Sequence, residues 1–120
     1  MSEIRGIGLD LCGIDRMKPM LDKPHFLSRI LTAEEITYLR SRGAAAADTL
    51  AGLYAAKEAV VKALGCGIAF PMTEIVIQHT PQGQPTAALT GEAARKYPGR
   101  FLLTIAHDEG IAAATAVYME

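Results

Sequence analysis

The longest helical pattern in the chain lies at residues 48–65, which read DTLAGLYAAKEAVVKALG. Apolar residues cover a broad surface of this segment, and Gly65 is typical of a helix C-terminus. Asp48 is a residue type that caps helix N-termini, so we expect it to begin a helix over 49–64. A helix with so much apolar surface must pack against other elements of the chain.

Strand-like segments lie on both sides of this helix. Five of them have alternating or β-type residues: 4–11, 73–79, 84–89, 100–107 and 111–119. The tripeptide at 108–110, Asp-Glu-Gly, predicts a hairpin between the last two. In the first strand, Gly6 and Gly8 indicate that another backbone approaches closely.

Shorter helices are expected at three other places. Residues 14–21 form one candidate, and Thr90 is expected to cap another that runs to Tyr97. A third is predicted over 33–42, because Thr32 and Glu35 have the spacing of a capping box and Gly43 follows. The sequence therefore predicts an α+β fold, with a largely antiparallel sheet packed against one long helix and shorter helices.

Composition excludes several classes of protein. The chain has 120 residues, a formal net charge of −1 and 50% hydrophobic residues, which suits one domain over 1–120 and no general disorder. It has no basic field and no Trp, which argues against nucleic acid as a main partner. We expect no membrane segment and no signal peptide. Cys12 and Cys66 fit no disulfide framework or zinc pattern, so we expect reduced thiols and a cytoplasmic protein.

Two carboxylates stand in apolar surroundings. Asp10 follows Ile-Gly-Leu, and Glu58 lies mid-helix among alanines and valines. A carboxylate in such surroundings must be solvated, paired or metal-bound. The ordinary interpretation is a solvated Asp10 at a strand end and an exposed pair between Glu58 and Lys62, worth a few tenths of a kcal/mol. The residues alone leave this interpretation and a functional one open.

The functional interpretation is a Mg²⁺–phosphate site. Mg²⁺ binds few protein carboxylates and completes its coordination with water and phosphate oxygens, while a lysine neutralises further phosphate charge. Gly65 and Gly67 would let the backbone approach a ligand, although Gly65 could equally serve only as a helix C-cap. His107 ends an apolar strand beside the hairpin, where its imidazole could meet a substrate or simply be solvated.

Four segments together resemble holo-acyl-carrier-protein synthases, which are small 4′-phosphopantetheinyl transferases. Residues 6–11, GIGLDL, followed by Arg16, resemble the N-terminal motif of that family, and 26–35, FLSRILTAEE, resemble its F-x-x-R-I-x-T-x-x-E segment. Residues 50–65 match its signature helix, and 103–108, LTIAHD, resemble its S-I-S-H strand. The resemblance runs nearly end to end, and the K-E-A-x-x-K helix is its most specific part.

This resemblance implies transfer of the phosphopantetheine arm of coenzyme A to a serine of an acyl carrier protein, with release of adenosine 3′,5′-bisphosphate. Asp10 and Glu58 would bind Mg²⁺, and Lys62 would hold the same phosphates. Glu58, directly or through a metal-held water, would take the serine proton. The residues expected in the coenzyme A pocket are Lys57, Lys62, Gly65, Gly67 and His107.

The resemblance also implies a homotrimer with sites between subunits, so that the Asp10 side and the His107 side of one site come from different chains. Four residues resemble the family's docking surface for the acidic carrier protein: Arg16, Met17, Met20 and Arg29. The alternative is that both methionines belong to the core and both arginines are merely solvated.

Three positions depart from the family pattern. Leu53 stands where the family usually has an arginine that holds nucleotide phosphates, Val61 where it often has serine, and Gly13 where it often has an acidic residue. The loss of the arginine predicts weaker coenzyme A binding unless another cation substitutes. It also leaves open a polyketide rather than a fatty acid carrier, and a module that binds coenzyme A or a carrier without transfer.

Overall fold

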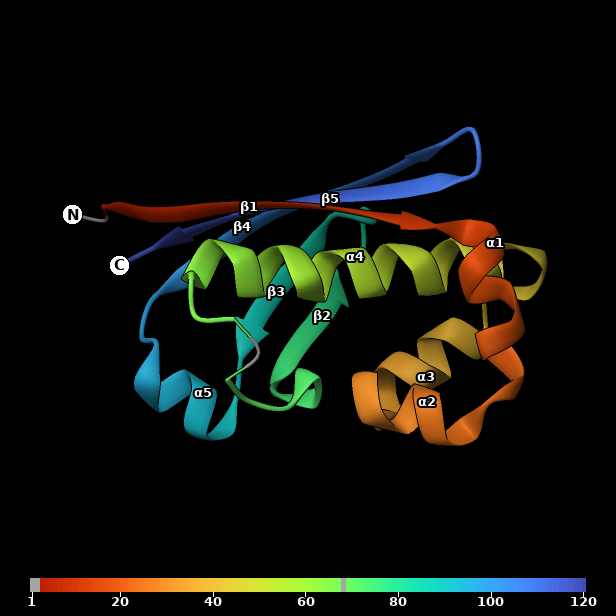
Figure 1. Cartoon of the computed structure of the whole chain (residues 1–120), viewed down its shortest axis with the longest axis horizontal. Helices are drawn as coiled ribbons and strands as arrows, with labels where there is room; N and C mark the ends of the chain where they lie inside the picture. The colour runs from red at the N-terminus through yellow and green to blue at the C-terminus, as the bar shows by residue number, and fades with distance from the viewer. Residues whose placement is uncertain (1–2, 68) are drawn as a thin grey trace.

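The computed structural model describes residues 3–67 and 69–120. It contains two antiparallel sheets and one long helix, together with shorter helices (Figure 1). The larger sheet has the order β1-β5-β4, with bounds Ile4–Gly13, Ile111–Met119 and Arg100–Asp108. The smaller sheet pairs β2, Ile75–His79, with β3, Pro85–Leu89. All pairs are antiparallel, so the α+β prediction is confirmed.

The long helix α4, Ala46–Leu64, packs along one face of the larger sheet, as Figure 1 shows. The other helices are α1, Ile14–Met17, α2, Pro24–Ile30, α3, Ala33–Arg40, and α5, Gly91–Lys96. Short 3₁₀ turns are η1, Lys18–Asp22, η2, Gly43–Ala45, and η3, Met72–Glu74. Across residues 3–67 and 69–120, none of the helices combines the length and the apolarity needed to cross a bilayer.

The sequence predicted the C-terminal end of α4 correctly and its N-terminal end wrongly. The helix ends at Gly65, whose φ of 72° is the left-handed conformation expected of a C-cap. Its start was predicted wrongly, because Asp48 lies in the first turn and Ala45 is the N-cap, with no side-chain cap. The alanines after Gly43 continue directly from η2 into the helix, because alanine has the highest helix propensity.

The predicted capping box at α3 is confirmed. The Glu35 N–H donates to Thr32 Oγ1 at 3.2 Å, and the Thr32 N–H donates to Glu35 Oε1 at 2.8 Å. Thr90 is the N-cap residue of α5, as predicted, but its hydroxyl donates to the Glu74 carbonyl at 3.3 Å and makes no capping hydrogen bond. The carboxylate of Glu74 caps α5 from outside, by accepting from the Ala93 N–H at 3.0 Å.

The last two strands form the predicted hairpin. Both Glu109 and Gly110 have positive φ, 51° and 78°, as a two-residue turn matched to the twist of the strands requires. The expectation of reduced thiols also agrees with the structure, in which Cys12 and Cys66 are free.

The first strand lies unusually close to α4. A Cβ at Gly6 would lie 1.9 Å from the Ala63 carbonyl oxygen, and one at Gly8 would lie 2.0 Å from the Ala59 carbonyl oxygen. The backbone approach predicted from these glycines is therefore confirmed. Because Gly6 faces a later turn of α4 than Gly8 does, the strand runs antiparallel to the helix and brings Asp10 toward the middle of it.

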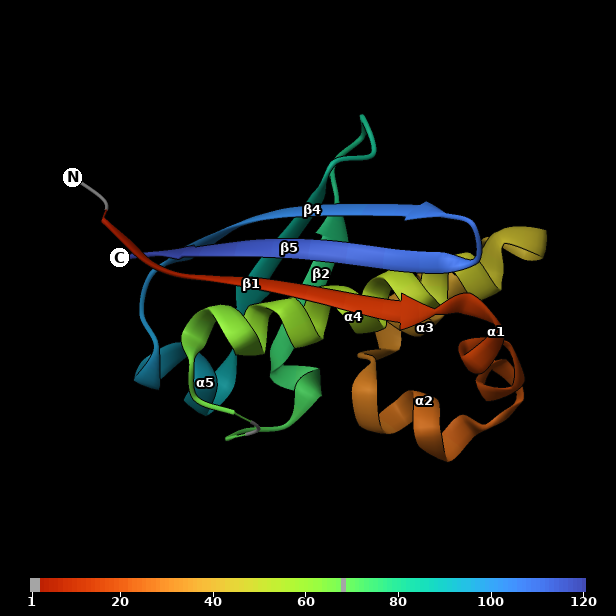
Figure 2. The same ribbon diagram turned by 45° about the horizontal axis from the view of Figure 1, so that its top comes forward.

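The other face of the larger sheet is exposed and apolar. Figure 2 shows β5 between β1 and β4, with α4 beneath them. We define the outer apolar face by five exposed side chains on the side away from α4: Ile7, Leu9, Leu11, Leu102 and Ile111. Ile7 is 68% exposed and Leu11 is 61% exposed, which is unusual for neighbouring apolar residues of one sheet.

We predict that Gly8→Ala destabilises the protein by about 3 kcal/mol or more, because the new methyl group would force strand and helix apart. Thermal unfolding should show a melting temperature lowered by roughly 10 °C or more. Gly13→Ala is the matched control, because its Cβ would lie 3.9 Å from the Cβ of Arg16, an ordinary contact, and its φ is −67°. Equal melting temperatures for the two variants would contradict the close approach.

Candidate functional site

Asp10 lies at the interface between β1 and α4, where Lys62 reaches it from the helix. Lys62 Nζ donates to Asp10 Oδ1 at 3.1 Å and to the Leu9 carbonyl oxygen at 3.0 Å. The Asp10 side chain is 15% exposed, while that of Lys62 is 54% exposed. The lysine therefore screens a largely buried carboxylate and keeps its own ammonium accessible to solvent.

Glu58 lies one turn before Lys62 on α4 and is half-buried. Within the described residues its carboxylate makes no hydrogen bond or ion pair, so the Glu58–Lys62 pair of the ordinary interpretation is not formed. Burial raises the pKa of the Tyr54 phenol, and the negative charges of Glu58 and, more weakly, Asp10 raise it further. Both predicted carboxylates thus lie around Tyr54, on the same side of the molecule.

Two further residues lie in this cluster: Tyr54, which the sequence did not indicate as functional, and Arg16, which was expected on the docking surface for the carrier protein. Tyr54 lies four residues before Glu58, a helical spacing that could have identified it. Arg16 Cζ lies 6.0 Å from the centre of the Tyr54 ring, and the positive charge of Arg16 opposes the rise in the Tyr54 pKa. The same guanidinium donates to Cys12 Sγ at 3.5 Å.

The oxygen donors of Asp10 and Glu58 are of the kind that Mg²⁺ prefers. Among the described residues no three His, Cys, Asp or Glu side chains form a group able to hold a metal by themselves. Two carboxylates beside an accessible lysine therefore fit a hard cation that takes its remaining ligands from water and substrate phosphate, and they do not fit a closed structural metal site.

Lys57 has a different role from the one expected in a coenzyme A pocket. Its side chain is fully buried, and its ammonium donates to Glu35 Oε1 at 2.6 Å and to the carbonyl oxygens of Ile30 at 2.6 Å and Met72 at 3.1 Å. An ammonium has three N–H donors, so none remains for a ligand. Burial lowers the pKa of Lys57, and its hydrogen bond to Glu35 opposes that shift. We therefore correct the expectation: Lys57 holds α4 to its neighbours.

The four residues expected to dock the carrier protein separate into two kinds. Arg16 and Arg29 are exposed. Met17 is 3% exposed and belongs to the core, so its assignment to a docking surface is wrong. Met20 is partly buried and packs against the same core, as the alternative interpretation of the methionines requires.

The turn after α4 begins at Gly65, three residues beyond Lys62. Gly65 and Gly67 both have positive φ, 72° and 65°, and a Cβ at either would meet no atom of the other described residues within 4 Å. The backbone there is open on its outer side, so a ligand could approach it closely.

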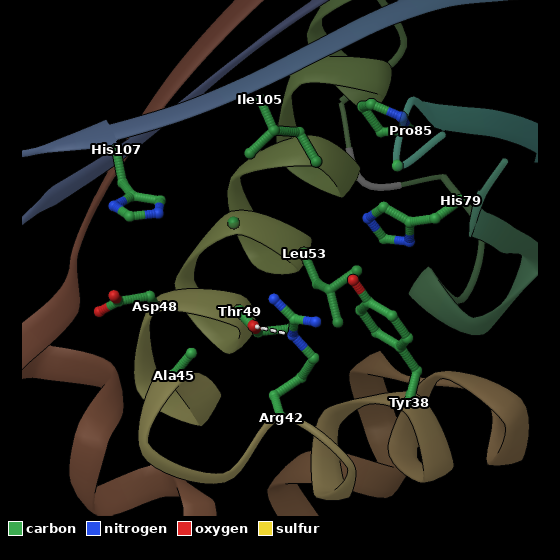
Figure 3. A pocket seen from close by; sticks show the side chains of 12 residues that line it. Tyr38, Arg42, Ala45, Asp48, Thr49, Leu53, His79, Pro85, Ile105 and His107 are labelled. Atoms are coloured by element: carbon green, nitrogen blue, oxygen red, sulfur yellow. Dashed lines mark hydrogen bonds between the residues drawn. The ribbon is translucent and has the colours of Figure 1, made fainter. Parts of the chain in front are cut away.

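His107 lies away from this cluster. It is on β4, which β5 separates from β1, so about two strand spacings, roughly 10 Å, divide the two edges. On the β4 side is a pocket of about 220 Å³, shown in Figure 3. We call it the Arg42 pocket. Its lining includes Tyr38, Arg42, Thr49, Leu53, His79 and His107. Leu53 and Glu58 project about 140° apart on α4, so one chain does not bring His107 to its own carboxylates.

Three residues of the Arg42 pocket were missed from the sequence. The rings of Tyr38 and His79 stack with centres 4.5 Å apart, and Arg42 Cζ lies 5.4 Å from the Tyr38 ring centre. Arg42 Nε donates to Thr49 Oγ1 at 3.4 Å. Burial lowers the pKa of His79, and the positive charge of Arg42 lowers it further. These residues come from α3, the segment after it, and β2, so no local spacing connects them.

Comparisons with known proteins agree on one family. The model of the 4′-phosphopantetheinyl transferase superfamily matches residues 6–116. Holo-[acyl-carrier-protein] synthases from Myxococcus xanthus and Clostridium kluyveri are 43% and 40% identical, over 95% of this chain and 94% and 89% of theirs. A Bacillus anthracis holo-(acyl-carrier-protein) synthase structure, in complex with CoA (3′,5′-ADP), has a TM-score of 0.83 and 32% identity, over 98% of this chain and 97% of that one.

We predict that Lys57→Met destabilises the fold by about 3–5 kcal/mol, because it leaves a buried Glu35 carboxylate without its cation. Denaturant unfolding measures the change. Lys62→Met is the matched control, and it should cost about 1 kcal/mol or less, because its ion pair is half exposed. Similar losses in the two variants would contradict the assignment of Lys57 as the structural lysine.

Proposed function

Since the chain belongs to the 4′-phosphopantetheinyl transferase superfamily, we propose that it is a holo-acyl-carrier-protein synthase, which transfers the phosphopantetheine arm of coenzyme A to a serine hydroxyl of an apo acyl carrier protein. The reaction breaks the phosphoanhydride bond and releases adenosine 3′,5′-bisphosphate. We place it in the cytosol, where Cys12 and Cys66 remain reduced.

One observation carries the assignment of the reacting end. The glycine-packed strand β1 holds Asp10 against Lys62, and Glu58 projects one turn away toward the same side. Lys62 would bind an oxygen of the diphosphate, because its exposed ammonium can turn from Asp10 toward a ligand. Asp10 and Glu58 would hold Mg²⁺ through their carboxylate oxygens. When bound, the ion would neutralise charge that develops on the phosphate oxygens.

Glu58 is our candidate for the general base. Its carboxylate is half-buried and has no protein hydrogen-bond donor among the described residues, so its oxygens are available to accept the serine proton directly or through a water. Asp10, by contrast, already accepts from Lys62 and is better suited to binding than to proton transfer.

The second half of the site would come from a neighbouring copy of the chain. The reacting carboxylates lie on the β1 side, and His107 lines a pocket on the β4 side. A cyclic homotrimer that buries the outer apolar face would cover its exposed side chains and bring these opposite edges of different copies together. Coenzyme A would then lie between subunits, along the open turn at Gly65 and Gly67 of one copy.

The carrier protein would approach near the reacting end. Arg16 is exposed and lies beside Tyr54, where its positive charge would attract an acidic partner, and Arg29 is a second exposed cation on α2. Met20 adds a partly buried apolar contact, while Met17 stays in the core.

We predict that Glu58→Gln abolishes loading of an apo acyl carrier protein, because the metal site loses one of its two carboxylates and the serine loses its base. Mass spectrometry of the carrier, after incubation with coenzyme A and Mg²⁺, measures the transfer. Unfolding curves should show that the variant is folded. Asp22→Asn makes the same kind of change at an exposed position in η1 and should load normally. Near-normal loading by Glu58→Gln would contradict its role.

We predict that Ile7→Glu converts the protein from trimer to monomer and removes transfer with it, because a buried charge would oppose closure of the outer apolar face. Light scattering after gel filtration measures the mass. Gln82→Glu adds the same charge in the exposed turn between β2 and β3 and should stay trimeric. A wild-type monomer with full activity would contradict the shared site.

A further inference from the structure

The Arg42 pocket contains charge and ring surfaces that the transfer step does not use. Arg42 lines it beside the stacked rings of Tyr38 and His79, and Leu53 contributes only an apolar wall. Figure 3 shows the Arg42 guanidinium near Thr49 and below Leu53, on the Tyr38 side of the pocket. We infer that Arg42 is a specificity-determining residue that binds the 3′-phosphate of coenzyme A, in place of a cation at position 53.

The guanidinium is held in place but keeps donors for a ligand. Its cation–π contact with the Tyr38 ring restrains the guanidinium, and its Nε bond to Thr49 uses one of five N–H donors. Within the described residues its terminal nitrogens make no hydrogen bond. A planar fork with two such nitrogens matches two oxygens of a phosphate group.

The imidazole of His79 extends this anion-binding surface. Because the charge of Arg42 and burial both lower the pKa of His79, the ring is mainly neutral at pH 7 and offers one N–H. The pocket also contains one carboxylate, Asp48, which Figure 3 places beneath His107 and apart from Tyr38 and His79. The Arg42 side is therefore the half that suits an anion.

The identity of the anion follows from the position of the pocket, and this step rests on the proposed function. The diphosphate must lie at Asp10, Lys62 and Glu58, on the β1 side, because the phosphopantetheine arm is transferred there. The Arg42 pocket lies on the β4 side, beyond β5 and on another flank of α4. Coenzyme A carries one further anionic group, the 3′-phosphate, and a neighbouring copy would present the pocket to it.

The test compares coenzyme A with 3′-dephospho-coenzyme A as substrates for carrier loading. The wild type should favour coenzyme A, and Arg42→Ala should raise the KM for coenzyme A about ten- to hundredfold more than the KM for the dephospho form, with kcat little changed. Arg40→Ala removes an exposed cation from the end of α3, outside the Arg42 pocket, and should leave the preference intact. Arg42→Lys should retain part of it.

Binding provides a readout that is independent of transfer. Calorimetry with adenosine 3′,5′-bisphosphate and with adenosine 5′-monophosphate should show a preference for the bisphosphate that Arg42→Ala removes, in variants whose melting temperatures show that they are folded. Equal effects on both ligands, or a retained preference in folded Arg42→Ala, would overturn the inference. A wild type that loads a carrier equally well from both substrates would overturn it while the proposed function stands. No loading from either would instead reject the function.

Discussion

Contact between two backbones determines where the reacting end of the site lies. Gly6 and Gly8 bring β1 against the Ala59 and Ala63 turns of α4, at a distance that no side chain at either glycine would allow. Asp10, two residues after Gly8, then lies beside the middle of α4, within reach of the Lys62 side chain. The position of this carboxylate therefore depends on the absence of two methyl groups from the strand.

On another side of α4, a buried ion pair holds the helix against its neighbouring elements. Lys57 reaches Glu35 and two backbone carbonyl groups, and Glu35 also accepts from the Ile77 N–H at 2.7 Å. This arrangement joins α4 to α3 and to β2. Because Lys57 and Glu58 are neighbours in the helix, the first projects into the core and the second projects to the edge near Asp10. The structural lysine thereby determines the direction of the functional carboxylate.

The features that could be predicted from the sequence depend on neighbouring residues. The capping box of Thr32 and Glu35, the C-cap at Gly65 and the Glu109–Gly110 hairpin each involve groups within a few positions of one another. The role of Lys57 could not be predicted in this way, because its partners lie 15 to 27 residues distant in the sequence. Its charge suggested a phosphate ligand, whereas only the fold shows that protein oxygens already surround it.

Contacts between residues distant in the sequence also explain why the effect of Leu53, which departs from the family pattern, cannot be judged from that position alone. Leu53 removes a cation from the family pattern, but the space it borders is also lined by Arg42, which comes from the segment after α3. A cation can reach one pocket from several elements, provided that something orients it, and here Tyr38 and Thr49 do so. A ligand meets the guanidinium itself, whichever position in the sequence supplies it. The loss of a cation at residue 53 therefore does not imply the loss of positive charge from the pocket.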